Sequence, residues 1–518
     1  MTELPKGWAV ATMGDLLLAI QAGKSLKCEE RPPKENERGV VKVSAVTWGT
    51  FDAAQSKTLP KSFEPMSDTA IKAGDFLFSR ANTLELVGAV VLVRNDHPNL
   101  FLSDKILRLD LDPALKPWLL KYLQSLEGKR KLAAVSTGNQ ASMRNIGQNE
   151  LKSVSIPFPP LNEQRRIVEK IEAMIERIDK GVENLRGAKA TLALYRQSLL
   201  KSAFEGKLTA DWRAQNADKL EPPKTLLARI QKERETRYKS ALDDWQTALA
   251  KWRAGGEVGR KPGKPSRPEP QTVVTPAELE QLPDLPKEWM FTKLANLGDL
   301  GRGKSKHRPR NDKRLFDGRY PFIQTGEVKA ANRFIREFTA TYSDFGLEQS
   351  KLWPAGTLCI TIAANIAQTA FLTFEACFPD SIVGFTAFSG GVSPEYVEYF
   401  IASARLNIEA YAPATAQKNI NLNTLETLNI PICSPAEQAE ITRILDTRLT
   451  AADRMEAEID AALTRADALR QSILKRAFAG NLVPQDPTDE PALTLLARIK
   501  AERAKAGKTK PRKTVHAG

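Results

Sequence analysis

The residues best suited to chemistry in this sequence are the basic side chains of one short loop. Seven of them lie within thirteen positions, with Asp312 as the only acidic residue among them: Arg302, Lys304, Lys306, Arg308, Arg310, Lys313 and Arg314. Basic groups at this density attract phosphate oxygens, and Arg, Lys, Asn and Gln also read base edges in the major groove. The loop predicts contact with a polyanionic backbone; a solvated surface loop is the alternative.

Smaller polar clusters follow predicted strands or precede predicted helices, where loops project from a globular domain. With four residues of the basic loop, the candidates for nucleic-acid contact are Lys24, Lys27, Arg80, Asn82, Arg144, Asn145, Lys304, Lys306, Arg308, Arg310, Asn365, Gln417, Lys418 and Asn419. Turn formation and helix capping are the alternative roles of these side chains.

Residues 298–305 also satisfy the phosphate-loop pattern G-x-x-x-x-G-K-[ST]. That motif holds phosphates only between a buried strand and the N-terminus of a helix, and the following Lys-His-Arg-Pro-Arg starts no helix. The chain has no Asn-Pro-Pro-aromatic segment of the kind DNA amino-methyltransferases use, no Gly-rich cofactor loop and only three histidines. We therefore expect no catalytic residue, no metal site and no cofactor in this chain.

The element that must position these clusters is the stretch 161–206. Apolar residues recur there at every seventh position, with a second column three residues earlier, which predicts a long helix with a coiled-coil seam. Gly206 stands where a C-terminal cap is expected. The same stretch returns 274 positions later without insertion or deletion, so that Gly206 corresponds to Gly480. The expected interface positions are Ile171, Ile178, Leu185, Leu192, Leu199, Leu445, Ala452, Ile459, Ala466 and Ile473.

This repeat divides the chain into two halves of similar plan. Leu-Pro-Lys-x-Trp opens a globular unit at Leu4 and again at Leu285, and Leu-Leu-Ala-Arg-Ile follows each long helix, at Leu226 and at Leu495. The expected order is a globular domain at 1–157, a spacer helix at 158–206, a charged linker at 207–284 with a helix at 225–250 and a mobile basic stretch, a second domain at 285–431, a second spacer helix at 432–480 and a basic tail at 481–518.

Short β-branched or aromatic runs predict the strands of both domains. The predicted strands are 40–46, 75–79, 88–94, 106–109, 320–324, 358–362, 370–374 and 381–388, and the predicted helices of the domains are 117–126 and 394–404. We expect an α+β fold: two globular α/β domains separated by two long helices packed as an antiparallel coiled coil, with a pseudo-twofold internal repeat. Helices that each cover only their own domain are the alternative.

Composition agrees with a polyanionic partner. The chain has 518 residues, with 76 Lys and Arg against 62 Asp and Glu, for a formal net charge of +14. Its four cysteines form no C-x-x-C pair and are expected to be buried and unpaired in a reducing compartment. The first residues resemble no signal peptide, and polar residues and Pro354 interrupt the longest apolar run, 352–374, which predicts two strands and no membrane span. We expect a cytoplasmic protein.

Three motifs carry a resemblance to a known family. They are Ile-Pro-Phe-Pro-Pro-Leu-Asn-Glu-Gln at 156–164, Arg-Gln-Ser-Leu-Leu-Lys-Ser-Ala-Phe-Glu-Gly at 196–206, both with second copies, and Ala-Thr-Ala-Gln-Lys-Asn-Ile at 414–420. The first domain departs from the last motif, and only Asn145 and Ile146 align with it. With these motifs, the layout of almost the entire chain resembles the specificity subunit of type I restriction–modification enzymes.

The resemblance implies two target-recognition domains, each binding one half of a split, asymmetric DNA site. It also implies that the helices set the unread gap and dock two methylation subunits, with restriction subunits joining outside. S-adenosylmethionine, ATP and Mg would then belong to those partner subunits. Two modules held a set distance apart by stiff helices are also what a bipartite site requires on physical grounds.

Two other interpretations remain open. A specificity subunit of a related system, with methylase and nuclease fused in one partner chain, would look the same. A coiled-coil adaptor that binds only protein would carry its charge incidentally, and its binding would lack the steep salt dependence of DNA binding.

Overall fold

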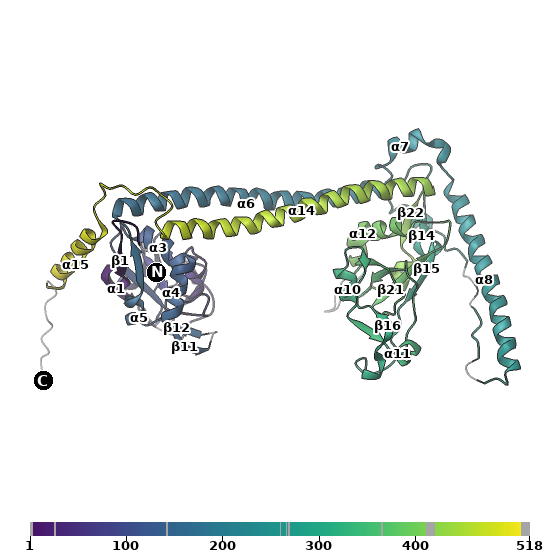
Figure 1. The fold of residues 1–518 in the computed structure, drawn as a ribbon, viewed down its shortest axis with the longest axis horizontal. Helices are drawn as coiled ribbons and strands as arrows, with labels where there is room; N and C mark the ends of the chain where they lie inside the picture. The colour runs from purple at the N-terminus through teal and green to yellow at the C-terminus, as the bar shows by residue number, and fades with distance from the viewer. Residues whose placement is uncertain are drawn as a thin grey trace. The chain divides into compact units, whose positions relative to one another are not determined.

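The computed structural model describes residues 4–24, 27–140, 143–258, 261–265, 267, 270–363, 366–410 and 420–508. They form two compact units: unit 1 lies within 1–187 and 459–518, and unit 2 within 188–458. The division falls inside both long helices, α6 (Leu161–Phe204) and α14 (Pro435–Phe478) (Figure 1). Each unit therefore combines a globular domain with the first part of one long helix and the last part of the other. The two helices have bounds 274 residues apart at both ends, which confirms the predicted repeat.

The globular domain of unit 1 is built on a sheet in the order β2-β10-β6-β8. Its strands are β2 (Leu17–Ala22), β10 (Ile106–Leu111), β6 (Phe76–Ser79) and β8 (Val90–Leu92). A second sheet has the order β4-β3-β9-β5, with β4 (Ser56–Thr58), β3 (Gly39–Val41), β9 (His97–Phe101) and β5 (Ala70–Ile71). The helices before α6 are α1 (Met13–Leu16), α2 (Ser44–Thr47), α3 (Lys116–Gln124), α4 (Leu126–Val135) and α5 (Gln148–Ser153).

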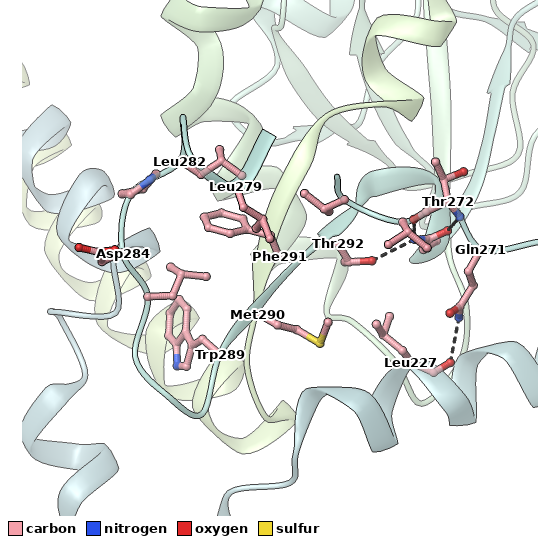
Figure 2. Close-up of a pocket in the computed structure, with 15 residues that line it drawn as sticks. Leu227, Gln271, Thr272, Leu279, Leu282, Asp284, Trp289, Met290, Phe291 and Thr292 are labelled. Carbon is pink, nitrogen blue, oxygen red and sulfur yellow. Dashed lines mark hydrogen bonds between the residues drawn. The ribbon is translucent and has the colours of Figure 1, made fainter. Parts of the chain in front are cut away.

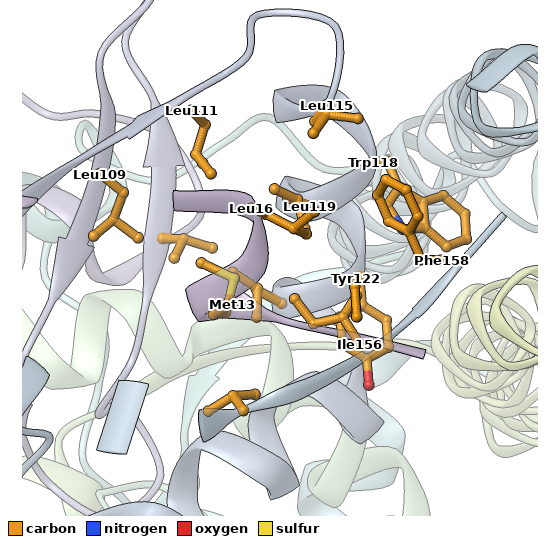
Figure 3. Close-up of a cluster of buried hydrophobic side chains, with 14 of the residues drawn as sticks. Met13, Leu16, Leu109, Leu111, Leu115, Trp118, Leu119, Tyr122, Ile156 and Phe158 are labelled. Atoms are coloured by element: carbon orange, nitrogen blue, oxygen red, sulfur yellow. The ribbon is translucent and has the colours of Figure 1, made fainter. Parts of the chain in front are cut away.

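Alternation along the central strand β6 explains why its four residues are all buried. Phe76 and Phe78 face one hydrophobic cluster, which includes α3, whereas Leu77 faces the cluster on the other side of the sheet. Successive side chains of a strand point to opposite faces, so a strand covered on both sides needs apolar residues at every position. Figure 3 shows the first cluster, in which Trp118 and Tyr122 of α3 lie against Phe158 and Ile156.

The globular domain of unit 2 repeats this plan with a sheet in the order β15-β21-β19-β20-β17. Its strands are β15 (Gly298–Arg302), β21 (Ile382–Ala387), β19 (Leu358–Thr361), β20 (Thr369–Leu372) and β17 (Phe334–Ile335). A second pair consists of β16 (Phe316–Phe322) and β18 (Ala340–Tyr342), and the helices are α10 (Thr325–Ala330), α11 (Asp344–Glu348), α12 (Pro394–Ala410) and α13 (Leu422–Glu426). In β19, Leu358 and Ile360 face one cluster and Cys359 the other, as in β6.

Most predicted strands are confirmed, but some bounds differ and several observed strands were not predicted. The prediction of a strand at 40–46 is wrong beyond Val41, because α2 begins at Ser44. The sequence prediction also omitted a strand pair in each unit: β1 (Ala9–Thr12) pairs with β13 (Ser155–Phe158), and β14 (Met290–Lys293) pairs with β22 (Asn429–Ile432). These pairs join the opening motif of each domain to the strand that leads into its long helix.

The two long helices pack antiparallel within each unit. In unit 1, Arg470 of α14 lies 2.5 Å from Asp179 of α6. In unit 2, Arg196 of α6 contacts both Asp453 and Glu456 of α14 at 2.7 Å. Arg196 occupies a seam position where an apolar residue was expected, and these two carboxylates account for it because they neutralise its charge across the interface.

The last turn of each long helix docks on the domain that precedes the other helix. In unit 1, the ring of Phe478 lies 5.0 Å from Trp118, and in unit 2 the ring of Phe204 lies 5.1 Å from Tyr396. The glycines that follow have positive φ, +70° at Gly206 and +73° at Gly480, in the left-handed conformation that ends a helix. A Cβ at Gly480 would lie 2.2 Å from Cγ of Pro5, and one at Gly206 would lie 2.5 Å from the equivalent proline of the second opening motif.

The Glu-Gln motif explains how unit 2 is fixed to its helix. Glu437 is fully buried at the start of α14 and accepts hydrogen bonds from Trp289 Nε1 at 2.9 Å and Thr209 Oγ1 at 2.7 Å. Arg213, in α7 (Ala210–Gln215), donates to the same carboxylate at 2.8–2.9 Å. One carboxylate thus joins the opening motif, the long helix and the segment that follows the other long helix.

Unit 1 has the same motif without the same partners. Glu163 is buried at the equivalent position, and burial raises the pKa of its carboxyl. Among the described residues, no hydrogen bond of normal geometry reaches Glu163 Oε1 or Trp8 Nε1, although Trp8 lies near enough to the carboxyl to lower its pKa in part. The nearest ion pair is one turn further on, where Arg166 contacts Asp489 at 2.7 Å.

In each unit, an ion pair also joins the globular domain to a long helix, and the two helix positions are equivalent in the repeat. Lys121 of α3 contacts Glu172 of α6 at 3.2 Å, and Asp446, 274 residues later in α14, pairs with Arg333. Arg333 also contacts the buried Glu398 of α12 at 2.7 Å. Burial raises the pKa of Glu398 to about 7, against the opposing charge of Arg333.

The repeated Leu-Leu-Ala-Arg-Ile motif packs on both units. In α8 (Pro223–Ala254), Leu226 and Ile230 enter the core of unit 2, and in α15 (Ala492–Lys508), Leu495 and Ile499 enter the core of unit 1. The linker helix is longer at both ends than the predicted 225–250. The linker thus belongs to unit 2 and the described part of the tail to unit 1.

Candidate nucleic-acid interface

The structure brings four predicted contact residues of unit 1 together on one small sheet. Its strands are β7 (Ala81–Asn82), β12 (Met143–Asn145) and β11 (Thr137–Gln140), in the order β11-β12-β7. Arg144 pairs in register with Asn82, and Asn145 with Ala81. Arg80 Nε donates to Asn145 Oδ1 at 3.2 Å, so residues 65 positions apart share one polar surface.

Hydrogen bonds hold this polar surface in a fixed geometry. Arg144 donates to Ser136 Oγ at 3.0 Å and also to the Ser136 and Gly138 carbonyls. Asn82 Nδ2 donates to Thr47 Oγ1 at 3.3 Å, which ties β7 to the end of α2. Side chains held in place lose less conformational entropy when they bind a base edge or a phosphate.

Two exposed apolar side chains flank this surface. Trp48 directly follows Thr47 and is 75% exposed, and Met143 directly precedes Arg144 and is 67% exposed. An exposed indole costs free energy in water unless a partner covers it, and aromatic rings stack on bases or wedge between them. The sequence prediction missed Trp48, because an isolated tryptophan is more often part of a core.

The predicted basic pair of unit 1 lies on another loop. Lys24 and Lys27 are exposed at the end of β2, on either side of residues outside the described range. Gly23, which precedes them, donates its N–H to the Ser103 carbonyl, as Gly303 does to the Ile382 carbonyl in unit 2. The two loops therefore leave their sheets at equivalent positions.

The basic loop of unit 2 has a fixed backbone and exposed charges. The Lys306 N–H donates to the Gln349 carbonyl at 3.2 Å, and Ser350 Oγ donates to the Lys304 carbonyl at 2.8 Å. The side chains of Lys304, Lys306, Arg308 and Arg310 are all exposed. Arg310 contacts Asp380 at 3.0 Å, a half-exposed pair that solvent weakens.

Electrostatics around this loop favour a bound anion. Hydrogen bonds from Arg314 hold the pKa of Asp312 well below its usual range, so the one acidic residue of the loop stays ionised and paired. Lys351, which the sequence analysis did not select, lies with its Nζ 3.6 Å from the centre of the Trp353 ring. Burial, together with the charge of nearby Lys304, lowers the pKa of Lys351. A phosphate oxygen would relieve this repulsion between two ammonium groups.

Ile146 and Ile420, the aligned isoleucines that end the last of the three motifs, each bond to the residue that follows a central strand. The Ile146 N–H donates to the Arg80 carbonyl at 2.8 Å, and the Ile420 N–H donates to the Ile362 carbonyl at 2.9 Å. Four predicted contact residues lie outside the described residues: Asn365, Gln417, Lys418 and Asn419. Ile366 and Ile420 are described and directly follow these residues.

The phosphate-loop pattern has no matching structure. Its first half is the strand β15, and residues 303–312, all described, contain no helix that could hold phosphates at its N-terminus. Within the described ranges, no cluster of His, Cys, Asp and Glu could hold a metal ion, and no helix is long and apolar enough to cross a bilayer. Cys359, Cys377 and Cys433 are buried and form no disulfide, whereas Cys28 is half-buried.

All ten predicted seam positions are buried or half-buried. Ile171 and Ile473 lie in the core of unit 1, and Leu199 and Leu445 in that of unit 2. The structure thus covers the seam residues, and it places the described polar candidates either on the small sheet of unit 1, as for Asn82, Arg144 and Asn145, or on loops.

Comparison with known proteins identifies the family. The description "Type I restriction modification DNA specificity domain" matches the chain twice, over residues 5–185 and 286–465. The EcoKI specificity subunit of Escherichia coli K12 is 22% identical over 524 residues, which is 98% of this chain and 97% of the relative. The EcoEI specificity subunit of Escherichia coli is 32% identical over 192 residues, 36% of this chain and 32% of the relative.

A solved structure from a type I restriction–modification system has the same fold. It superimposes with a TM-score of 0.61 at 18% identity and covers 93% of this chain and 100% of its own. Two dissimilar domains on repeated long helices, each with a polar surface, therefore define a DNA-recognition protein. The chain belongs to the family of type I restriction–modification DNA specificity subunits. It is a non-catalytic subunit with two target-recognition domains.

Proposed function

We propose that this chain selects a bipartite, asymmetric DNA site, with the domain of unit 1 on one half-site and that of unit 2 on the other. The internal repeat is the observation that carries the proposal. The main sheets of the two domains share the arrangement of four strands, to which unit 2 adds β17, and both domains adjoin long helices of 44 residues, whereas their polar surfaces differ in residues and geometry. Two domains that are held by equivalent long helices but carry different polar surfaces suit two different half-sites around a fixed gap.

In unit 1, the proposed contacts are Arg80, Asn82, Arg144 and Asn145, with Lys24 and Lys27 on the adjoining backbone. In unit 2, Lys304, Lys306, Arg308 and Arg310 contact phosphates, and Asn365, Gln417, Lys418 and Asn419 complete the surface. Arg and Asn suit base edges because they form bidentate hydrogen bonds with guanine and adenine, while lysines suit phosphates as point charges.

The partners are two methylation subunits docked on the long helices, with restriction subunits joining outside. Exposed apolar residues on these helices support such docking: Leu194 and Met455 in unit 2, and Leu469 in unit 1. S-adenosylmethionine, ATP and Mg are proposed to bind those partners. A partner in which methylase and nuclease are fused would dock on the same residues.

Co-expression with the methylation subunit, followed by mapping of methylated bases in genomic DNA, tests the proposal. The expected result is a split motif, with two short defined halves around a fixed undefined gap. Replacement of residues 285–431 by the corresponding domain of a relative should change one half and leave the gap unchanged. A stable complex without methylation would refute the proposal in favour of an adaptor that binds protein only.

A further inference from the structure

The linker forms an arm, which consists of α8 and the segment that returns from it to Thr272. Recognition of two half-sites does not explain the role of this arm. The first turns of α8 are fixed to the domain of unit 2, where Arg229 donates to the Gly390 carbonyl and Arg237 to Ser389 Oγ, both at 2.8 Å. Beyond Arg237 the helix continues for another 17 residues, to Ala254. Figure 1 shows α8 running alongside this domain toward the level of α11, before the chain turns back.

The apolar side of the arm is already covered by the chain itself. Five large residues recur at coiled-coil spacing along the outer part of α8: Tyr238, Leu242, Trp245, Leu249 and Trp252. Trp245 Nε1 donates to the Pro262 carbonyl at 3.1 Å, and Lys264 Nζ lies 5.8 Å from the centre of the Trp245 ring. Leu249 is only 9% exposed. The returning segment therefore covers the apolar side of α8, on which a partner helix would otherwise pack.

The base of the arm is braced where the returning segment meets the domain. Gln271 Nε2 donates to the Leu227 carbonyl at 3.1 Å, and Thr272 exchanges hydrogen bonds of 2.8–3.0 Å with the Asn296 side chain. Figure 2 shows this contact at one side of a largely apolar cleft of about 520 Å³, with Met290 and Phe291 in its wall. Both α8 and the returning segment are thus attached to the domain of unit 2, and these two attachments fix the direction of the arm relative to that domain.

What the arm presents to solvent is positive charge. From Lys251 onward, its described residues carry five exposed cations against one exposed carboxylate, Glu257, whereas the preceding turns carry Lys239 against Asp243 and Asp244; the five cations are Lys251, Arg253, Lys261, Lys264 and Arg267. Within the described part of the arm, none of these five cations forms an ion pair with a carboxylate. Two of these cations lie on the last turn of α8 and three on the segment that returns from it. Cations at the end of a braced helix, without an open apolar face, suit a polyanion rather than a protein surface, which would need apolar contact.

We propose that the arm is an additional DNA-binding element that contacts the phosphates of duplex flanking the half-site of unit 2, without reading sequence. The proposal rests on the proposed function, because it assumes that the domain of unit 2 holds DNA. At about 1.5 Å per residue, the free part of α8 spans about 25 Å, or roughly seven base pairs at 3.4 Å each. Its five cations are enough to raise affinity for any sequence.

Salt titration of the assembled complex of full-length chain and methylation subunit tests this inference. The variant replaces the five cations by glutamine, and the matched control exchanges Lys for Arg and Arg for Lys at the same positions and so keeps the charge. Binding to a 60-base-pair duplex without the target is measured from about 50 to 300 mM salt. Because each phosphate contact contributes about 0.9 to the slope of log K against log salt, we expect the glutamine variant, which removes five cations, to lose about 4.5 from that slope and the control none.

An unchanged slope in the glutamine variant overturns the inference. Loss of the methylation subunit from the glutamine complex, but not from the control, also overturns it, because the arm would then bind protein. The methylated motif should be the same in wild type and variant, since the arm reads no bases. If the wild type yields no split motif, the proposed function fails, whereas the slope still decides whether the arm binds DNA.

Discussion

Replacement of Glu437 by glutamine should loosen unit 2, while the same replacement of Glu163 should leave unit 1 intact. Glu437 accepts bonds from Trp289, Thr209 and Arg213 with no exposure to solvent. An amide keeps the shape but turns one acceptor into a donor that faces other donors, and it leaves the Arg213 charge buried and unpaired. Breaking a buried pair in this way costs about 3 to 5 kcal/mol.

Hydrogen exchange read by mass spectrometry measures this cost separately in each unit. Peptides from β14 and β22 should exchange about a hundredfold faster in the Glu437→Gln variant, because 1.4 kcal/mol corresponds to a factor of ten. Glu163→Gln removes a carboxyl whose burial disfavours its charge and whose Oε1 accepts no hydrogen bond of normal geometry from the described residues, so peptides from β1 and β13 should be unaffected or slower. Equal acceleration in both variants would refute the argument that Arg213 makes the two sites different.

Three further substitutions test other parts of the structure. Gly480→Ala should destabilise unit 1 by about 1 to 3 kcal/mol in urea unfolding, because φ is +73° at this residue and the new Cβ would meet Pro5. Gly181→Ala lies in open space within α6 and should stabilise unit 1 by about 0.5 to 1 kcal/mol. Equal effects of the two variants would contradict the close contact between Gly480 and Pro5. Glu398 binds its proton more tightly in the folded domain, so the stability of unit 2 should fall by about 3 kcal/mol as pH rises from about 4.5 to about 7, and a Glu398→Gln variant that keeps this slope would disprove the assignment. Trp48→Ala should reduce methylation at sites of the mapped motif at least tenfold with little change in Tm, because the indole is 75% exposed, and full activity would exclude a contact with bases.

The sequence predicted the long helices better than the domains because the repeat supplied a second, independent copy of each helix. Their bounds follow from one seam and one glycine cap, both of which are local signals. β15 gave no such signal, since two of its five residues are glycine. The structure explains the composition: a Cβ at Gly301 would lie 2.7 Å from the Trp353 ring, a contact between residues 52 positions apart that periodicity cannot reveal.

Some residues of the candidate interface could likewise be predicted from local sequence, whereas others could not. Residue type and loop position were enough to select Arg80 and Asn145, but their hydrogen bond depends on how β7 and β12 pair, which no local pattern encodes. Trp48 was missed because its exposure is set by the turn after α2, a helix that begins within the strand predicted at 40–46. Basic loops can be selected by composition, whereas an exposed aromatic residue is recognised only once the core is known.

Unit 1 is assembled from the first and last parts of the chain, which has a consequence for its synthesis on the ribosome. Its globular domain comes first, yet Phe478, which covers Trp118 and Tyr122, lies in the last tenth of the chain. At roughly 5 to 20 residues per second, the 271 residues of unit 2, from Ala188 to Glu458, take on the order of 15 to 55 seconds to make. During that interval the nascent domain displays an aromatic surface, so we expect it to engage chaperones and to reach its final stability only after translation is nearly complete.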